Sequence, residues 1–298
     1  MVKTESGVGT KCIFNKSGKF VSNFSLSSKD SNSETIRMFG FVWLHNTNRL
    51  LAGEEIDNNK AADYHSNLVI VDTSGKLVKR LILNPARHFM GWYYPDNNDD
   101  KILFTESYLD GSFASGFSRT ENLNILSLAE NKIELRIDNF NRNGDLLIAE
   151  SPWSPDGAMF VYSIGKQHEL WLSGHLLNAH DSTISGSYIF DLNKKKDIKF
   201  IEGSKEAVWN STLNLIAYIK DNSIWLYDLN NDSKKLIFSP FRNKPGAINN
   251  IHWTPDGKFI YINGYTSSRN FYEKLIDVDG NQIKFKPLNL CNFSFSWK

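Results

Sequence analysis

Short apolar segments recur along the whole chain, and each is bounded by residues typical of turns. The two clearest copies begin at a tryptophan. Trp153–Gly157 reads Trp-Ser-Pro-Asp-Gly and precedes the apolar segment 159–162, and Trp253–Gly257 reads Trp-Thr-Pro-Asp-Gly and precedes the apolar segment 259–262. In such a turn Pro presets φ, Asp accepts hydrogen bonds from the backbone and Gly supplies a positive φ. Each copy therefore predicts a strand, a tight turn and a second strand.

Weaker copies of the pattern place an anchor residue at the end of the first strand in six repeats. The anchors are separated by 50, 60, 56, 44 and 44 residues. They are Trp43, Tyr93, Trp153, Trp209, Trp253 and Trp297. A second marker follows each of the first five anchors: a short apolar strand that ends in Asp or Ser directly before a turn. This marker ends at Asp72, Ser127, Asp191, Asp228 and Asp277.

The two markers divide each repeat into four strands, A to D, which is the composition of one β-propeller blade. The chain ends carry an incomplete repeat, because Trp297 is an A strand with nothing after it and segment 13–15 is a marker without an anchor. Joining the ends leaves 44 residues from Trp297 to Trp43, which matches the shortest repeats. We therefore predict a single all-β domain, 1–298, folded as a six-bladed propeller. Its last blade takes the inner strand from residues near 291–298 and the outer strands from residues near 1–25.

The Trp-Ser-Pro-Asp-Gly repeat at 153–157 resembles that of the TolB-like six-bladed propellers, whose repeats are WD40-like. The resemblance implies a non-catalytic propeller that docks a protein or peptide partner. Similar propellers also serve as gating or substrate-selecting domains of serine peptidases and as the body of some pectin-degrading lyases. The sequence lacks the Gly-x-Ser-x-Gly nucleophile elbow, so we do not predict a peptidase active site in it.

Extra length is concentrated between the anchor and the second marker, where the B–C loop lies. This part spans 29, 34 and 38 residues in the first three repeats, against 19 and 24 in the next two. B–C loops emerge on one face of a propeller, and long loops on a rigid scaffold commonly serve binding. We therefore predict a binding face formed by loops 54–66, 106–121 and 164–186, with aromatic rings among charges as in protein interfaces. Its candidate residues are Glu54, Glu55, Tyr64, Glu106, Tyr108, Asp110, Phe113, Phe117, Arg119, His168, Trp171 and His175.

Charge and composition narrow the class of partner. With 34 basic and 33 acidic residues the net charge is +1, which provides no positive field for nucleic acid or an anionic membrane. No apolar run is long enough to cross a bilayer, and residues 1–9 do not read as a signal peptide. We expect a monomer that is periplasmic or secreted after removal of a leader, with a cytoplasmic location as the alternative. Cys12 and Cys291 are predicted to be free thiols rather than a disulfide.

A metal site and a catalytic site are the two alternatives to a simple binding face. His168, His175 and His180 share one loop, but their spacing matches no metal-ligand motif, so we predict no metal and no cofactor. Glu54, Glu106 and Glu150 fall near strand ends, and paired carboxylates perform acid–base chemistry on glycans. The alternative function is therefore a carbohydrate-active hydrolase or lyase that uses carboxylates or histidines of the same loops. We favour binding without catalysis.

Overall fold

A computed structural model describes the backbone of residues 2–4, 10–14, 20–25, 27–29, 34–58, 63–81, 88–112, 116–137, 146–164, 171–172, 175–176, 186–240, 246–266, 268 and 270–284. These residues form strands and turns, and every strand pairing is antiparallel. The chain divides into two compact units, the first containing strands β1–β12 and the second strands β13–β26.

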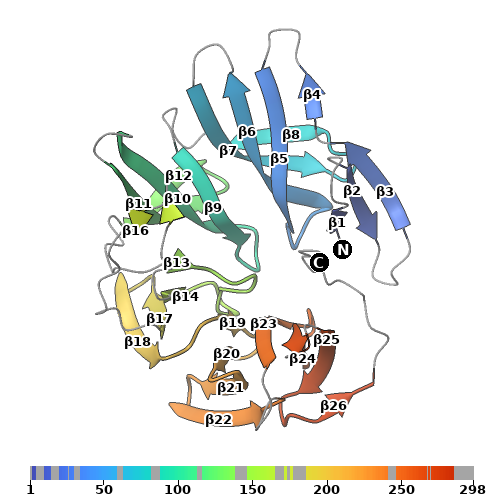
Figure 1. Ribbon diagram of the computed structural model, residues 1–298, viewed down its shortest axis with the longest axis vertical. Helices are drawn as coiled ribbons and strands as arrows, with labels where there is room; N and C mark the ends of the chain where they lie inside the picture. Colours follow the sequence, from blue (N-terminus) through green and yellow to red (C-terminus); the bar gives the residue numbers. More distant parts are fainter. Residues whose placement is uncertain are drawn as a thin grey trace. The chain divides into compact units, whose positions relative to one another are not determined.

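The first unit contains three sheets (Figure 1). One is a three-stranded sheet of β1 (Val2–Thr4), β2 (Thr10–Phe14) and β3 (Phe20–Ser25). Blade 1 consists of β5 (Glu34–Trp43), β6 (Arg49–Asn58), β7 (Asp63–Asp72) and β8 (Leu77–Leu81), with β4 (Ser27–Lys29) added beside β5. Blade 2 consists of β9 (His88–Pro95), β10 (Lys101–Ser112), β11 (Gly116–Ser127) and β12 (Lys132–Ile137).

The second unit contains three further blades, each with four strands in sequential order. Blade 3 consists of β13 (Leu146–Leu147), β14 (Met159–Ile164), β17 (Gly186–Asp191) and β18 (Lys196–Glu202). Blade 4 consists of β19 (Ala207–Trp209), β20 (Leu215–Lys220), β21 (Ser223–Asp228) and β22 (Ser233–Phe238). Blade 5 consists of β23 (Gly246–Trp253), β24 (Phe259–Thr266), β25 (Phe271–Asp277) and β26 (Gln282–Ile283).

The blade count corrects the sequence prediction. The described part of the chain contains five blades with four strands from A to D, not six, and it shows no blade closed by the two chain termini. Residues near the N-terminus do form strands, but as the separate sheet β1–β2–β3. The sixth blade was inferred from Trp297 and from residues near 291–298, all of which lie outside the described residues.

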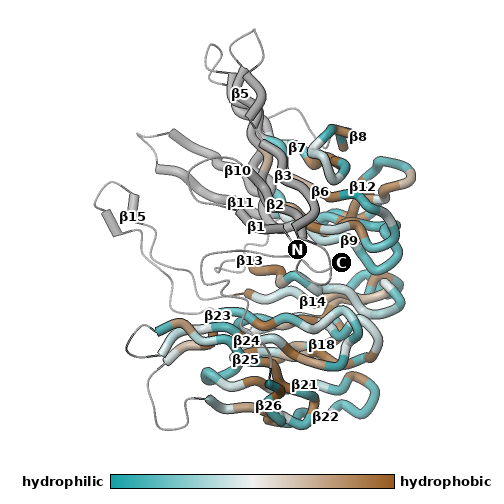
Figure 2. Tube along the Cα trace, turned by 90° about the vertical axis from the view of Figure 1, so that its right-hand side faces the viewer, coloured by the Kyte–Doolittle hydropathy of each residue, from teal (hydrophilic) through white to brown (hydrophobic). Residues whose placement is uncertain are grey.

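The second marker of the repeat is confirmed in all five blades, because strands β7, β11, β17, β21 and β25 end at the predicted Asp or Ser. The reason is local hydrogen bonding. In four blades the carboxylate of the last residue of strand C accepts a hydrogen bond from the backbone N–H two residues further on; these residues are Asp72, Asp191, Asp228 and Asp277. In blade 2, Ser127 Oγ accepts a hydrogen bond from the backbone N–H of Glu130. These carboxylates stop the ladder and start the turn into strand D. Hydrophobic residues accordingly lie along strands such as β21 and β24, and hydrophilic residues gather at the turns (Figure 2).

Four tryptophan anchors occupy the same register position. Trp43 pairs with Leu50, Trp153 with Phe160, Trp209 with Ile216 and Trp253 with Ile260. All four are buried, with at most 5% of their surface exposed. The other described tryptophans do not take this position: Trp92 lies within β9, Trp171 in β15, and Trp225 in strand C of blade 4. Trp297 lies outside the described residues.

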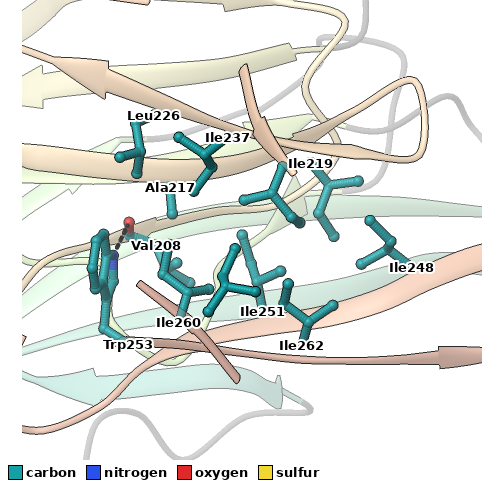
Figure 3. Close-up of a cluster of buried hydrophobic side chains, with 12 residues drawn as sticks. Val208, Ala217, Ile219, Leu226, Ile237, Ile248, Ile251, Trp253, Ile260 and Ile262 are labelled. Atoms are coloured by element: carbon teal, nitrogen blue, oxygen red, sulfur yellow. Dashed lines mark hydrogen bonds between the residues drawn. The ribbon is translucent and has the colours of Figure 1, made fainter. Parts of the chain in front are cut away.

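Two of these anchors fill the space between neighbouring blades of the second unit. Trp209 belongs to a cluster with Val161, Ile189 and Ile201 of blade 3. Trp253 belongs to a cluster built from blades 4 and 5, and its Nε1 donates a hydrogen bond to the Val208 carbonyl at 3.2 Å (Figure 3). The prediction that Trp209 and Trp253 are buried between adjacent blades is therefore confirmed.

Blade 2 departs from the predicted alignment by two residues. Pro95, not Tyr93, pairs with Ile102 and so takes the position of the tryptophans. The positive φ that Gly157 and Gly257 supply in blades 3 and 5 is supplied here by Asp99, with φ of 59°. The dipeptide Pro-Asp therefore enters the turn two residues earlier than it does in blade 3. Tyr93 is still buried, and its hydroxyl accepts the Gly53 N–H of blade 1 at 2.7 Å.

Candidate functional site

The predicted loops of blades 1 and 2 are extended β-hairpins rather than irregular loops. Most of 54–66 belongs to β6 and β7, and most of 106–121 belongs to β10 and β11. Strand β6 has 10 residues and β10 has 12, against 6 in the corresponding strand β20 of blade 4. The sequence correctly placed the extra length, but its assignment as loop was wrong. A paired ladder presents side chains on a stiffer frame than a loop does.

Register shows where the extensions begin. The last B–C pair of blade 4 is Lys220–Ser223, and the two residues between them, Asp221 and Asn222, both have positive φ, as in a type I′ turn. Counted from the end of strand C, the equivalent pairs are Glu54–Asn67 in blade 1 and Glu106–Asn122 in blade 2. Pairing continues outward from there to Asn58–Asp63 and to Ser112–Gly116.

An ion pair with a buried carboxylate marks the base of each extended hairpin. Glu54 is 1% exposed and accepts two hydrogen bonds from Arg80 of strand D, each at 2.7 Å, as well as one from Asn67. In blade 2, Glu106 is 2% exposed, lies 3.3 Å from Arg136 and accepts a hydrogen bond from Asn124. We call these two arrangements the Glu–Arg braces. Each joins strand B to strand D across strand C.

The other predicted binding residues are placed by backbone only. They lie beyond the braces on the extended hairpins or on a short hairpin of β15 (Trp171–Leu172) and β16 (His175–Leu176). On β6 and β7 these are Glu55 and Tyr64; on β10 and β11 they are Tyr108, Asp110, Phe117 and Arg119; on β15 and β16 they are Trp171 and His175. Phe113 and His168 lie outside the described residues.

A second group of ionisable residues lies close in sequence to the tryptophan anchors of blades 3, 4 and 5; sequence reasoning named Glu150 as a possible catalytic carboxylate but missed Glu206 and His252. Glu150 and Glu206 each precede their blade's tryptophan anchor by three residues, and His252 directly precedes Trp253. His252 Nδ1 lies 3.1 Å from Glu150 Oε2, and its side chain is 10% exposed. The Glu206 carboxylate accepts the backbone N–H of Ile251, next to His252. We call Glu150, Glu206 and His252 the inner-strand cluster.

Glu206 and His252 hold their protons more tightly than the same side chains would in water. Burial of the Glu206 carboxylate, with the charge of Glu150 added, raises its pKa to about 7, although His252 and the Ile251 N–H oppose the shift. Burial alone would lower the pKa of His252, but Glu150 and Glu206 outweigh it and the pKa is raised. The position relative to the tryptophan anchors is the signal that could have found this group.

Within the described ranges, no three His, Cys, Asp or Glu side chains are placed to hold a metal ion. No described helix is long and apolar enough to cross a membrane.

Comparison with solved structures assigns the fold. The Dos1 propeller matches over 91% of this chain and 63% of its own, with 13% identity and a TM-score of 0.55. A structure from a study of two prolyl endopeptidases matches over 93% of this chain and 37% of its own, with 12% identity and a TM-score of 0.56. The chain has the β-propeller fold. TolB from Acinetobacter baumannii covers 83% of this propeller and 67% of its own chain at 14% identity, with a TM-score of 0.47.

Sequence comparison is less specific. No family model matches this propeller. A probable dipeptidyl-aminopeptidase B of Aspergillus fumigatus is 23% identical over 183 residues, which are 58% of this chain and 18% of that protein. The propeller therefore spans a small fraction of that relative. At these identities the comparisons establish the fold and leave the activity to be argued from the residues.

Proposed function

We propose that this chain is a non-catalytic binding propeller of the TolB-like kind that docks a protein or peptide partner. We place the docking surface on the extended hairpins of blades 1 and 2, and we propose separately that segment 164–186 also contacts the partner. The observation that carries the proposal is the continuation of the B–C ladders beyond the braces, to Asn58–Asp63 and Ser112–Gly116. Blade 4 closes the same hairpin with a two-residue turn, so the blade itself does not require the extra strand.

The composition of the extensions supports an interface. They carry the aromatic residues Tyr64, Tyr108 and Phe117 together with charged residues such as Asp110 and Arg119. Aromatic and Arg side chains supply much of the energy at protein interfaces. Successive residues on a strand also point to opposite faces, so a paired hairpin can present one set of side chains to a partner.

Catalysis on a glycan is less well supported. Of the three carboxylates that suggested it, Glu54 and Glu106 are buried and bound to Arg80 and Arg136. Their oxygens are engaged by arginines of the same blade, so a structural role accounts for both carboxylates. The third carboxylate, Glu150, belongs to blade 3 and pairs with His252 of the inner-strand cluster. Binding accounts for the extended hairpins without assigning them chemistry.

Two single substitutions test the proposed surface. Phe113→Ala and Trp171→Ala are each expected to weaken partner binding by about 2 kcal/mol, or roughly thirtyfold, because aromatic anchors are desolvated on binding. Thermal stability should stay nearly unchanged. The partner is first captured from the source organism with the full chain, and its Kd is then measured by calorimetry. Leu213→Ala is the control, since Leu213 is 51% exposed in the A–B turn of blade 4.

Hairpin replacement gives a stronger test of the same surface. Residues 55–66 are replaced by Asp-Asn, so that Glu54 and Asn67 are joined by the turn that joins Lys220 and Ser223. Residues 107–121 are replaced in the same way between Glu106 and Asn122. Both braces remain, so the variants should fold while partner binding is lost. If the affinity for the partner is unchanged in both hairpin variants and is weakened by Leu213→Ala instead, the proposed surface is wrong.

A further inference from the structure

The inner-strand cluster spans three consecutive blades. Glu150 precedes the anchor of blade 3, Glu206 lies next to β19 of blade 4, and His252 is on β23 of blade 5. The same strands are tied together a few residues further on. Trp209 N–H donates to the Ser151 carbonyl, Ser151 Oγ donates to the Trp209 carbonyl at 2.8 Å, and Trp253 Nε1 donates to the Val208 carbonyl.

The groups that act on the cluster come from each of these elements. His252 is flanked by Glu150 and Glu206, and its ring stacks on Tyr261 of β24 with centroids 6.1 Å apart. The Tyr261 hydroxyl in turn donates to Glu273 of β25. Glu206 is acted on by His252, by Glu150 and by the backbone N–H of Ile251. The imidazole is therefore paired with one carboxylate, Glu150, and its protonated form is stabilised by the charge of a second, Glu206.

The net charge of the inner-strand cluster changes when Glu206 and His252 gain or lose their protons. With Glu206 neutral and His252 protonated, the ion pair between His252 and Glu150 balances the site. When both protons leave, two carboxylates remain on neighbouring inner strands beside a neutral imidazole. Like charges in a poorly solvated site repel, and the nearest hydrogen bonds between the strands must resist that repulsion.

We propose that Glu150, His252 and Glu206 form a proton-operated latch that holds the inner strands of blades 3, 4 and 5 together. The latch is closed when Glu206 and His252 carry their protons, and it loosens when they lose them. It is independent of the partner surface on the hairpins, because none of its residues lies on them. Its ligand is the proton, and it makes the packing of these three blades dependent on pH.

The direction of the pH dependence follows from linkage. A carboxyl group with a raised pKa in the folded protein favours the protonated folded state, so its contribution is lost as pH rises from about 4.5 towards 7. An imidazole with a raised pKa is stabilising at low pH, and that contribution is lost as pH rises through its folded pKa. Glu206 and His252 therefore both make the folded state less stable as pH rises. The latch is therefore tighter at pH 5.5 than at pH 8.5.

Hydrogen exchange of the full chain tests the latch. Protection factors of the amides in Ala207–Trp209 and Ile251–Trp253, corrected for intrinsic exchange, are expected to fall about tenfold or more between pH 5.5 and pH 8.5. Amides in Ile102–Phe104 of blade 2 serve as the reference and should change little. In Glu206→Gln, which keeps the shape but cannot ionise, most of the pH dependence should disappear. Equal profiles in the wild type and in Glu206→Gln overturn the proposal.

A second measurement does not depend on a variant. Carbon-13 shifts of the Glu206 carboxyl and of the His252 ring are followed in the wild-type chain across the same pH range. Glu206 is expected to titrate near pH 7 and to affect the His252 shift, because the two groups are coupled. Titration of Glu206 near its ordinary pKa of 4.5, without effect on His252, overturns the latch.

Discussion

Trp253→Ala is expected to lower the free energy of unfolding by about 3–5 kcal/mol, the range for large aromatic truncations in a core. The side chain is 4% exposed, packs in the cluster between blades 4 and 5 and satisfies its Nε1 with the Val208 carbonyl. Truncation opens a cavity between two blades, and the surrounding strands can collapse into it only partly. Chemical denaturation followed by circular dichroism measures the loss.

Trp225→Ala is the matched control for this substitution. Trp225 lies in strand C of blade 4 and is only partly buried. The same number of atoms is removed, so the difference between the two variants isolates the effect of the anchor position. A loss below about 1 kcal/mol for Trp253→Ala, or an equal loss for Trp225→Ala, contradicts the role of the anchor between blades.

Arg80→Ala is expected to cost about 3 kcal/mol, because it leaves the buried Glu54 carboxylate without its charged partner. Glu54 is 1% exposed, whereas the Arg80 side chain is 37% exposed, so water can replace part of the lost interaction. Asn67 still donates one hydrogen bond to Glu54. The loss is measured by denaturant unfolding at pH 7, with Val78→Ala as the control, since Val78 lies on the same strand and is 42% exposed.

Removing the charge from Glu54 separates the ion pair from the packing. Glu54→Gln combined with Arg80→Ala should recover part of the stability lost in Arg80→Ala alone, since no buried charge is then left unpaired. If Arg80→Ala costs no more than Val78→Ala, the brace does not contribute to stability. Arg136→Ala in blade 2 should behave as Arg80→Ala does, because Glu106 is equally buried.

The sequence predicted most reliably what local chemistry decides. Each strand C ends at the predicted Asp or Ser because that side chain bonds to the turn backbone, and this interaction spans only two or three residues. The tryptophan anchors of blades 3, 4 and 5 were found for a similar reason. In blade 2 the same reasoning failed, because Asp99 adopts the positive φ that Gly adopts elsewhere. A Pro-Asp dipeptide alone therefore did not fix the register.

The candidate sites were harder to predict because they depend on pairing between distant segments. Residues 54–60 are mostly polar, so their pattern does not distinguish an extended strand from a loop. Glu54 and Glu106 could be recognised as structural only once Arg80 and Arg136 were placed beside them. The inner-strand cluster joins residues about 50 positions apart, and it follows from the packing of three consecutive blades.

The Glu–Arg braces have a consequence for how these blades can change. Each brace fixes strands B, C and D at the level where the shortest blade already closes its hairpin. Local unfolding that starts at the tip of a long hairpin therefore has to break the Glu–Arg brace before it reaches the core. Insertions, deletions or foreign peptides beyond the brace are therefore expected to leave the folding of the blade unchanged. The two hairpins are thus suited to vary in length and sequence while the scaffold beneath them stays the same.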